Sequence, residues 1–257
     1  MGTAHPDRPV LLLPPSKGKA AGGDGPPYGP ELSTSSPLGA ARRELLDAVD
    51  KDLEVVDDQT LARIAGVRAK DVDTARQQLR RLRVAPTLPA HRRYTGIVHG
   101  NAGLADLDPA DVAVDVRMVS ALAGLVDLAQ PLPPYRLEFA ASLPSLGGLA
   151  GWWRTRLTEH VAEVVSGRRV WDLLPGEHAR IWDPEVRSQA EVIAFAFLRP
   201  DGRAANAART KVCKGRLAAF VIAHPDTDVD GVVDNADPGE GWTLDADAGG
   251  VRATYIG

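Results

Sequence analysis

The stretch VLLLPPSKGK, residues 10–19, decides how the start of the fold is read. Its four consecutive apolar residues predict a short strand that is buried on both faces. Two prolines end this strand, and a Gly/Pro/Ser-rich loop is expected over residues 17–36. Lys17 follows the strand, and open sheets bind ligands at the carboxyl ends of their strands. Lys17 therefore predicts an anion site there, and an exposed, solvated loop lysine is the equally weighted alternative.

The sequence beyond this strand alternates between helix and strand patterns. Helical spacing of apolar residues predicts helices over residues 39–49, 60–82, 108–125, 151–165 and 204–223. Strand patterns occur over residues 93–99, 169–174 and 192–198, and a terminal hairpin is expected from residues 242–244 and 251–256. Because no clear linker or internal repeat interrupts this alternation, we expect one α/β domain over residues 1–257.

The composition limits the classes of protein to which the chain can belong. Its 257 residues, 44% of them hydrophobic, are enough to bury a substantial core. A net charge of −4 argues against a basic nucleic-acid binder, so attraction to phosphate would need a local basic patch. The single cysteine, Cys213, excludes an internal disulfide framework. Without a recognisable secretory signal or a bilayer-spanning apolar run, we expect a soluble, cytoplasmic protein with no membrane partner.

The predicted helix over residues 60–82 is interrupted by IAGV, residues 64–67. A short helix before Gly66 and a longer one after it predict a helix-hairpin-helix-like element. The turn of such an element can present backbone N–H groups to a phosphate, and Arg68 and Lys70 would add phosphate contacts. A plain two-helix hairpin with a glycine C-cap is the commoner explanation of the same pattern.

The stretch PPYRLEF, residues 133–139, places an aromatic hydroxyl, a guanidinium and a carboxylate behind a rigid turn. In an extended segment Arg136 and Glu138 would share one face, and Tyr135 would take the other. A buried Arg136–Glu138 pair that holds the loop in place is one explanation. The other is a guanidinium presented to a phosphate or carboxylate, which would make the segment part of a binding site.

Two further groups of polar side chains lie near the ends of predicted strands. Tyr94 and His99 belong to the predicted strand over residues 93–99, although a lone histidine is more often structural than catalytic. Glu177 and His178 follow the predicted strand over residues 169–174, where a carboxylate and an imidazole can do acid–base work. These two residues, with Tyr135, are the catalytic candidates.

The basic run RTKVCKGR, residues 209–216, lies on a predicted helix. Lys211 and Lys214 share one helix face, where they are either solvated or available to an anion. Cys213 belongs to an apolar stripe, which predicts an inert, core-facing thiol. Gly215 inside a helix costs about 1 kcal/mol relative to alanine. Its presence predicts the close approach of another chain segment or a ligand.

The sequence contains none of the standard enzyme signatures. CxxC, HExxH, GxSxG and a GxGxxG motif in a strand–helix–strand context are all missing. The six histidines are scattered, and no His/Asp/Glu cluster has the spacing of metal ligands. We therefore expect no metal and no cofactor, and the sequence leaves open whether the protein is an enzyme.

In their order along the chain, these stretches resemble the YaaA family of peroxide-stress proteins. The resemblance rests on PPSKGK (14–19), YTG (94–96), VSALAGL (119–125), PPYRLEF (133–139), GWWR (151–154), DLLPGEH (172–178) and KVCKGRLAAF (211–220). The family has Ser-Pro-Ala-Lys at the first of these stretches and Asn-Leu-Ala-Ser where this chain has Asp-Leu-Leu-Pro. The stretches span nearly the full length, PYRLEF is the most specific of them, and the chain resembles a divergent member.

The resemblance implies a single mixed-sheet α/β domain with a helix-hairpin-helix-like element and a positively lined cleft. It also implies a role in limiting oxidative damage, associated with DNA binding and with control of free intracellular iron. We expect one anion-binding cleft to gather a set of polar side chains: Lys17, Tyr135, Arg136, Lys211, Lys214 and Arg216. Tyr94 and Glu138 come from matching stretches and are expected to belong to the same site.

The sequence is consistent with two main functions. The first is a stress protein that binds DNA without sequence choice through Arg68, Lys70 and the cations of residues 209–216. The net charge and the acidic residues Asp71 and Asp73 count against it. The second is an enzyme that acts on a small phosphorylated or nucleotide-like substrate held in a cleft. A structural or adaptor role ranks third.

Overall fold

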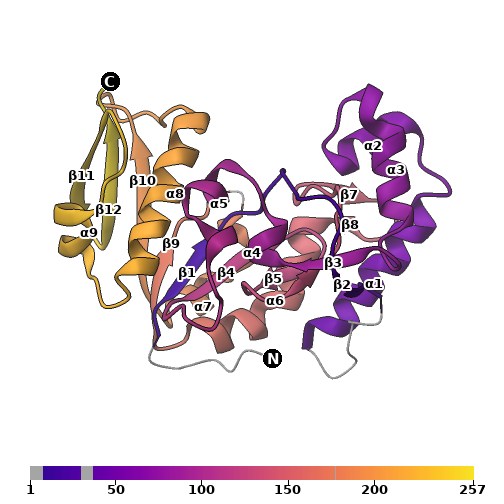
Figure 1. The fold of residues 1–257 in the computed structure, drawn as a ribbon, viewed down its shortest axis with the longest axis horizontal. Coiled ribbons are helices and arrows are strands. Elements are labelled where there is room, and N and C mark those ends of the chain that lie inside the picture. Colours follow the sequence, from indigo (N-terminus) through magenta and orange to yellow (C-terminus); the bar gives the residue numbers. More distant parts are fainter. Residues whose placement is uncertain (1–7, 30–36, 177) are drawn as a thin grey trace.

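The computed structural model describes residues 8–29, 37–176 and 178–257 as a mixed α/β fold. The largest sheet has the strand order β11-β12-β10-β9-β1-β4-β5 (Figure 1). These strands are β1 (Val10–Leu13), β4 (Asp115–Ser120), β5 (Gly124–Val126), β9 (Arg169–Asp172), β10 (Glu191–Leu198), β11 (Trp242–Asp247) and β12 (Gly250–Tyr255). The five inner strands run parallel, whereas β5 and β11 pair antiparallel at the two edges. The α/β class with a mixed sheet is confirmed.

Strand β1 lies in the middle of the sheet, between β9 and β4. Each of its four apolar residues is at most 1% exposed, so the strand is buried on both faces as its sequence predicts. From β1 the chain proceeds to β4 on one side, and it later returns to place β9 on the other side. The strand order therefore reverses at β1, and in open sheets ligands bind at the carboxyl ends of the strands at such a point.

Helices and short strands surround this sheet. The helices are α1 (Pro37–Asp52), α2 (Asp58–Ala65), α3 (Val72–Arg80), α4 (Ala90–Arg93), α5 (Ile97–Asn101), α6 (Leu149–Val165), α7 (Pro184–Arg187), α8 (Ala207–Ala223) and α9 (Val229–Asn235). Single 3-10 turns are η1 (Ala69–Asp71), η2 (Leu104–Asp106) and η3 (Ala179–Ile181). Short strands β2 (Gly25–Pro27), β3 (Pro86–Pro89) and β6 (Pro131–Leu132) form a second sheet, and β7 (Ser142–Leu143) pairs with β8 (Gly147–Gly148). In Figure 1, α2 and α3 stand at one end of the molecule and the β11–β12 hairpin at the other.

Two predicted elements are wrong. The predicted helix over residues 108–125 is instead a turn followed by β4 and β5. Asp108 caps only this turn, where its Oδ1 accepts a hydrogen bond from the N–H of Ala110 at 2.9 Å. The β-branched residues behind the turn then fill a strand that is buried beside β1, an environment that favours Val over good helix formers.

The predicted strand over residues 93–99 is the second error, because the structure has helices α4 and α5 there. Between these helices the backbone forms a short pairing with the loop that follows β1. The N–H of Thr95 donates to the carbonyl of Gly18 at 3.1 Å. The alternation of apolar and polar residues reflects burial on two short helices and not one sheet face.

Residues 60–82 form two helices joined by a turn, with Gly66 in the left-handed conformation at a φ of 63°. The N–H groups of Gly66 and Val67 both donate to the carbonyl of Ala62. This is the glycine C-cap expected of a plain two-helix hairpin. These two N–H groups are used within α2 and are not presented to a ligand.

Candidate functional site

A cavity of about 610 Å³ opens at the carboxyl ends of β1 and β9. Four parts of the chain line it: residues 14–19 after β1, residues 96–99 at the start of α5, residues 135–139 of the PPYRLEF stretch, and the first half of α8. Ala65 of α2, together with Pro175 and His178 after β9, completes the wall. The cavity therefore lies at the point where the strand order reverses, and we call it the β1–β9 cavity.

The loop that carries Lys17 and Lys19 is anchored by Arg93, whose side chain is fully buried. Its guanidinium donates to the carbonyls of Leu132 at 3.0 Å and Gly22 at 2.8 Å, and also to that of Ala20. Burial lowers the pKa of Arg93 to about 10, so the side chain stays charged at neutral pH. Arg93 thus holds the Gly/Pro-rich loop to the body of the protein.

Two glycines allow the loop to pass close to the segment before α5. A Cβ atom on Gly96 would lie 2.5 Å from the hydroxyl oxygen of Ser16, and one on Gly18 would lie 2.9 Å from that of Thr95. Real Cβ atoms do not approach so closely, so larger residues would push the two walls apart. The YTG and PPSKGK stretches are therefore parts of one structural unit.

Lys19 is the loop lysine that is directed inward. Its Nζ donates to the carbonyl of Ser16 at 2.7 Å and lies 4.0 Å from the centre of the Tyr135 ring. Burial lowers the pKa of Lys19 to about 7, and the charge of Arg136 adds to the effect, whereas Glu138 opposes it. Lys17, from which the sequence predicts the anion site, has a side chain that is 74% exposed. The sequence offers one signal for Lys19, which is its position directly after Gly18 in the same loop.

His99 is a further ionisable group of the cavity wall, and it is buried. It is 2% exposed, and neither ring nitrogen has a hydrogen-bond partner among the described residues. Its ring packs edge-on against Tyr94, with 5.3 Å between the ring centres. Burial and the nearby Lys19 lower the pKa of His99 to about 3. The neutral imidazole therefore brings one donor and one acceptor to the cavity wall.

The PPYRLEF stretch both ties the loop down and lines the cavity. Arg136 donates to the carbonyl of Lys17 at 2.8 Å, and the carboxylate of Glu138 lies 2.9 Å from the Lys17 ammonium. The predicted Arg136–Glu138 pair is thus replaced by two separate contacts with Lys17. The hydroxyl of Tyr135 hydrogen-bonds to those of Tyr94, at 2.8 Å, and Ser120, at 3.0 Å. Burial raises the pKa of Tyr135 well above its usual value, so the phenol stays protonated.

Helix α8 contributes two lysines with different surroundings. Lys214 is buried, and its Nζ donates to the carbonyl of Leu173 at 2.6 Å. Burial lowers its pKa to about 8, with Asp172 acting in the opposite direction. Lys211 is exposed at the rim. Gly215 makes this placement possible, because a Cβ there would lie 2.4 Å from the Cβ of Asn101 in α5, which is the predicted close approach.

The structure separates the remaining predicted site residues from the β1–β9 cavity. Arg216 lies outside it and pairs with Asp237, so its expected convergence with the other five residues is wrong. Arg68 pairs with Asp71 at 3.3 Å, and Lys70 is exposed on the hairpin. Both lie outside the cavity wall.

The catalytic candidates differ in their placement. Tyr135 lines the cavity, and so does His178, whose ring centre is 5.4 Å from that of Phe139. Glu177 lies outside the described residues. Tyr94 stands behind Tyr135 and reaches the site through the hydroxyl–hydroxyl contact.

Cys213 lies next to these lysines but faces the core. It is fully buried, and burial raises its pKa to about 12. This confirms the predicted core-facing thiol.

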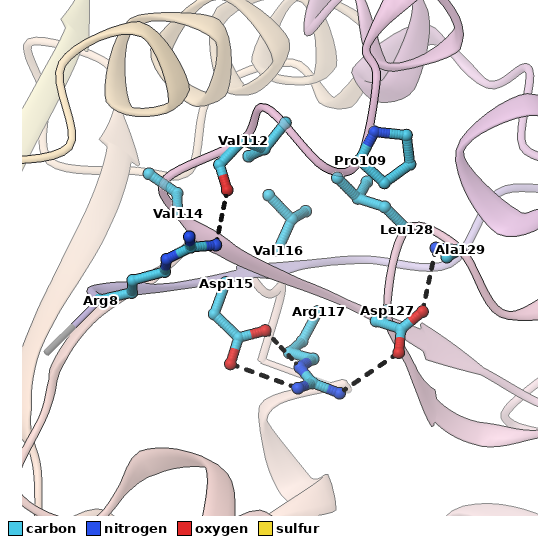
Figure 2. A pocket seen from close by; sticks show the side chains of 10 residues that line it. All are labelled: Arg8, Pro109, Val112, Val114, Asp115, Val116, Arg117, Asp127, Leu128 and Ala129. Atoms are coloured by element: carbon cyan, nitrogen blue, oxygen red, sulfur yellow. Dashed lines mark hydrogen bonds and ion pairs between the residues drawn. The ribbon is translucent and has the colours of Figure 1, made fainter. Parts of the chain in front are cut away.

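A second cavity, of about 160 Å³, lies at the opposite, amino ends of β1 and β4 (Figure 2). The guanidinium of Arg117 bonds to Asp115 at 2.6 Å and lies 3.9 Å from Asp127. Arg8 donates to the carbonyl of Val112 at 2.9 Å. Because Arg117 is engaged with two carboxylates and Arg8 with a backbone carbonyl, these charged groups hold the ends of the strands together.

Among the residues that the structure describes, no three His, Cys, Asp or Glu side chains gather closely enough to hold a metal ion. Nor does any described helix have the length and apolar character needed to cross a membrane.

Comparison with known proteins places the chain in a family. The sequence model described as "Peroxide stress protein YaaA" matches residues 10–248. The chain is 29% identical to UPF0246 protein SCO2297 of Streptomyces coelicolor over 217 residues, 83% of each chain. It is 27% identical to UPF0246 protein Cgl1995/cg2186 of Corynebacterium glutamicum over 213 residues, 81% of this chain and 83% of the relative. Because the family match covers nearly the whole sequence, the chain belongs to the YaaA family of peroxide stress proteins.

Proposed function

We propose that this protein serves in the response to peroxide stress and that its β1–β9 cavity binds a small phosphorylated or nucleotide-like anion. The family supports the first part, and the charge of the cavity wall supports the second. Five cationic side chains and a single carboxylate, that of Glu138, belong to the described wall. The five cations are Lys17, Lys19, Arg136, Lys211 and Lys214. Their convergence is the observation that carries the proposal.

The size and position of the cavity also favour a small ligand. A volume of about 610 Å³ falls within the range of roughly 300–1,000 Å³ that is usual for small-molecule sites. The wall is built from several separate segments at a reversal of strand order, as in other open sheets that bind nucleotides. A double helix is too wide to enter such a cavity and would contact only its rim.

Non-specific DNA binding is the second candidate, and one observation favours it. The turn of the α2–α3 hairpin lies beside the mouth of the cavity, since a Cβ on Gly66 would lie within 2.0 Å of the Glu138 carboxylate. The exposed Lys17, Lys211 and Arg68 could therefore contact one phosphate backbone. In that case the protein would limit iron-mediated oxidative damage while bound to DNA.

One titration experiment distinguishes these two functions. A fluorescent short DNA duplex is followed by anisotropy over a salt series, and pyrophosphate and mononucleotides are added as competitors and in thermal-shift assays. If a mononucleotide or pyrophosphate raises the melting temperature and the duplex does not bind, the cavity is a small-anion site. Duplex binding that weakens steeply with salt supports the DNA function instead.

Variants then locate the binding surface. The substitution Lys211→Glu reverses a charge at the rim of the cavity. It should therefore weaken the binding of either ligand, the small anion or the DNA duplex. Lys51→Glu is the matched control, since Lys51 is an exposed lysine of α1 outside the cavity wall. Equal effects of the two substitutions would mean that only net charge matters, and the assignment of the site would fail.

A further inference from the structure

The chain concentrates its lysines in the β1–β9 cavity. It has 30 lysines and arginines in total, of which only six are lysines, and four of those six line this one cavity. The other two, Lys51 and Lys70, are exposed. An arginine stays charged under all conditions of interest, whereas a lysine can lose its proton and react as an amine. Lysine at this place can offer amine chemistry in addition to charge.

The four cavity lysines are not equivalent. Lys17 is held by the Glu138 carboxylate, and Lys211 is exposed to solvent. Lys214 is bonded to the carbonyl of Leu173, and the charge of Asp172 favours its ammonium form. Lys19 has no carboxylate within ion-pairing distance among the described residues, and it is surrounded by other cations. Lys19 is therefore the lysine whose neutral amine is favoured most.

The surroundings of Lys19 suit a reaction with a bound ligand. Its Nζ rests on the face of the Tyr135 ring and is bonded to one backbone carbonyl, so its position is defined. A desolvated lysine with cationic neighbours is a nucleophile at neutral pH. His99 adds a buried imidazole without described partners to the same wall. Its neutral ring can donate to or accept from an oxygen atom of the ligand.

We propose that Lys19 forms an imine with a phosphorylated aldehyde or ketone whose phosphate is held by Arg136 and Lys211. This inference rests on the proposed function, because it uses the same cavity as an anion site. It goes further by naming the reacting group of the ligand and the residue that attacks it. Arg136 offers a planar guanidinium for the phosphate oxygens, and Lys211 neutralises charge at the rim.

The reaction is balanced without an added oxidant or reductant. The lone pair of the neutral Lys19 amine forms a bond to the carbonyl carbon, and the π electrons of the carbonyl move to oxygen. The nitrogen loses a proton to water and the oxygen gains one, which gives a carbinolamine. Loss of the hydroxyl group as water, with the remaining N–H proton returned to solvent, leaves the C=N bond. The net change is carbonyl plus amine to imine plus water.

Borohydride trapping tests this inference directly. The probe is pyridoxal 5′-phosphate, a phosphorylated aldehyde, and sodium borohydride converts an imine into a stable secondary amine. Intact-protein mass and peptide mapping then give the number and position of the adducts. We expect one dominant adduct at Lys19, loss of that adduct in Lys19→Arg, and no change in the control variant Lys51→Arg.

The outcomes separate this inference from the proposed function. A thermal shift with pyrophosphate is measured in parallel on wild type and on the control variant Lys51→Arg, and it should be the same in both because Lys51 lies outside the cavity wall. If pyrophosphate binds but the probe labels all exposed lysines alike, the imine inference is overturned and the anion site stands. If Lys19 is labelled and pyrophosphate neither binds nor blocks the labelling, the phosphate recognition is overturned.

A folding control keeps the test decisive. Lys19→Met is compared with Lys19→Arg, and both must melt cooperatively before labelling is interpreted. Should one variant fail to fold, the other still answers the question. Peptide mapping of the wild-type protein answers it without any variant, since a dominant adduct at a lysine other than Lys19 contradicts the inference.

Discussion

Lys19 couples the electrostatics of the cavity to the stability of the protein. Its pKa is about 7 in the folded protein against 10.5 as the ordinary value. Between these two values the unfolded state binds more protons, so the contribution of Lys19 to the free energy of unfolding rises with pH. At and below about pH 7 the folded state bears the full penalty of a buried ammonium, which is relieved as pH rises towards 10.5.

We predict that Lys19→Met is stabilising near pH 7 and below, and that this advantage shrinks as the pH approaches 10. Urea unfolding at a series of pH values measures the difference from wild type. Lys51→Met is the control, because Lys51 is exposed and should show no such trend. A difference that stays constant with pH would contradict the prediction. The groups that face Lys19 and enter this titration are Lys17, Arg93, Tyr94, His99, Tyr135, Arg136 and Glu138.

Arg93 anchors the loop that follows β1 in the sequence, and its loss should destabilise the protein. Arg93→Met would leave the carbonyls of Leu132, Gly22 and Ala20 without their charged donor. Hydrogen bonds to charged groups are worth about 1.5–3 kcal/mol each, so we expect a loss of at least about 2 kcal/mol. Urea unfolding gives this value, and proteolysis of residues 17–29 should become faster.

The neighbouring residue supplies a matched control for this prediction. Arg92 is half-exposed, and its guanidinium lies 3.7 Å from the carboxylate of Asp24. Exposed ion pairs contribute roughly 0–1 kcal/mol, so Arg92→Met should change stability little. Similar losses in the two variants would show that charge, and not the buried anchor, is responsible.

At the scale of elements, the contact of α5 with α8 sets the shape of the cavity wall. Gly215 of α8 faces α5, where a Cβ would meet the Val98 carbonyl at 2.6 Å and the Asn101 Cβ at 2.4 Å. Gly215→Ala would gain about 1 kcal/mol of helix propensity. Forcing extra atoms into a packed contact costs about 1–3 kcal/mol, and it would also displace Lys214.

We therefore predict that Gly215→Ala is destabilising and weakens anion binding. Gly151→Ala is the matched control, since Gly151 lies in helix α6 with nothing within 4 Å of an added Cβ. That substitution should be neutral or should stabilise the protein by up to about 1 kcal/mol. Chemical denaturation and the pyrophosphate thermal shift test both variants. A stabilising Gly215→Ala would show that the two helices can separate freely.

At the scale of the whole molecule, the sheet is completed by its last strand. Strand β12 runs parallel to β10, and its residues Val251 and Ala253 are buried. Its partner β11 forms the edge of the sheet. The ring of Trp242 in β11 packs against that of Phe197 in β10, with 6.1 Å between the ring centres. Burying one such apolar side chain contributes about 1.5–3 kcal/mol, and a whole domain has only about 5–15 kcal/mol of stability.

We predict that removal of residues 242–257 abolishes cooperative unfolding, because it exposes β10 and its phenylalanines at a new sheet edge. Thermal melting and size-exclusion chromatography would show a broad transition and association. Removal of Ile256 and Gly257 alone is the control, as both are exposed. A shortened chain that still melts cooperatively as a monomer would mean that the sheet is complete without β12.

Several elements could be predicted from the sequence because their cause is local. Four apolar residues between prolines are enough to specify β1, and a turn at Ala248 and Gly249 joins the two predicted strand runs into the β11–β12 hairpin. The helical spacing in α1, α6 and α8 and the glycine that ends α2 also act within a few residues of the chain. The sequence likewise placed a lysine-bearing loop at a strand end, where the cavity lies.

The tertiary structure alone decided which residues face the cavity. Residues 93–99 and 108–125 were misassigned because their conformation depends on pairing with the loop after β1 and with β1 itself, far away in sequence. Lys17 and Lys19 are two positions apart, yet only Lys19 is desolvated. Arg216 forms an ion pair with Asp237 outside the cavity wall. Burial and charge at a point are sums over neighbours from many segments, and a pattern within one segment does not contain them.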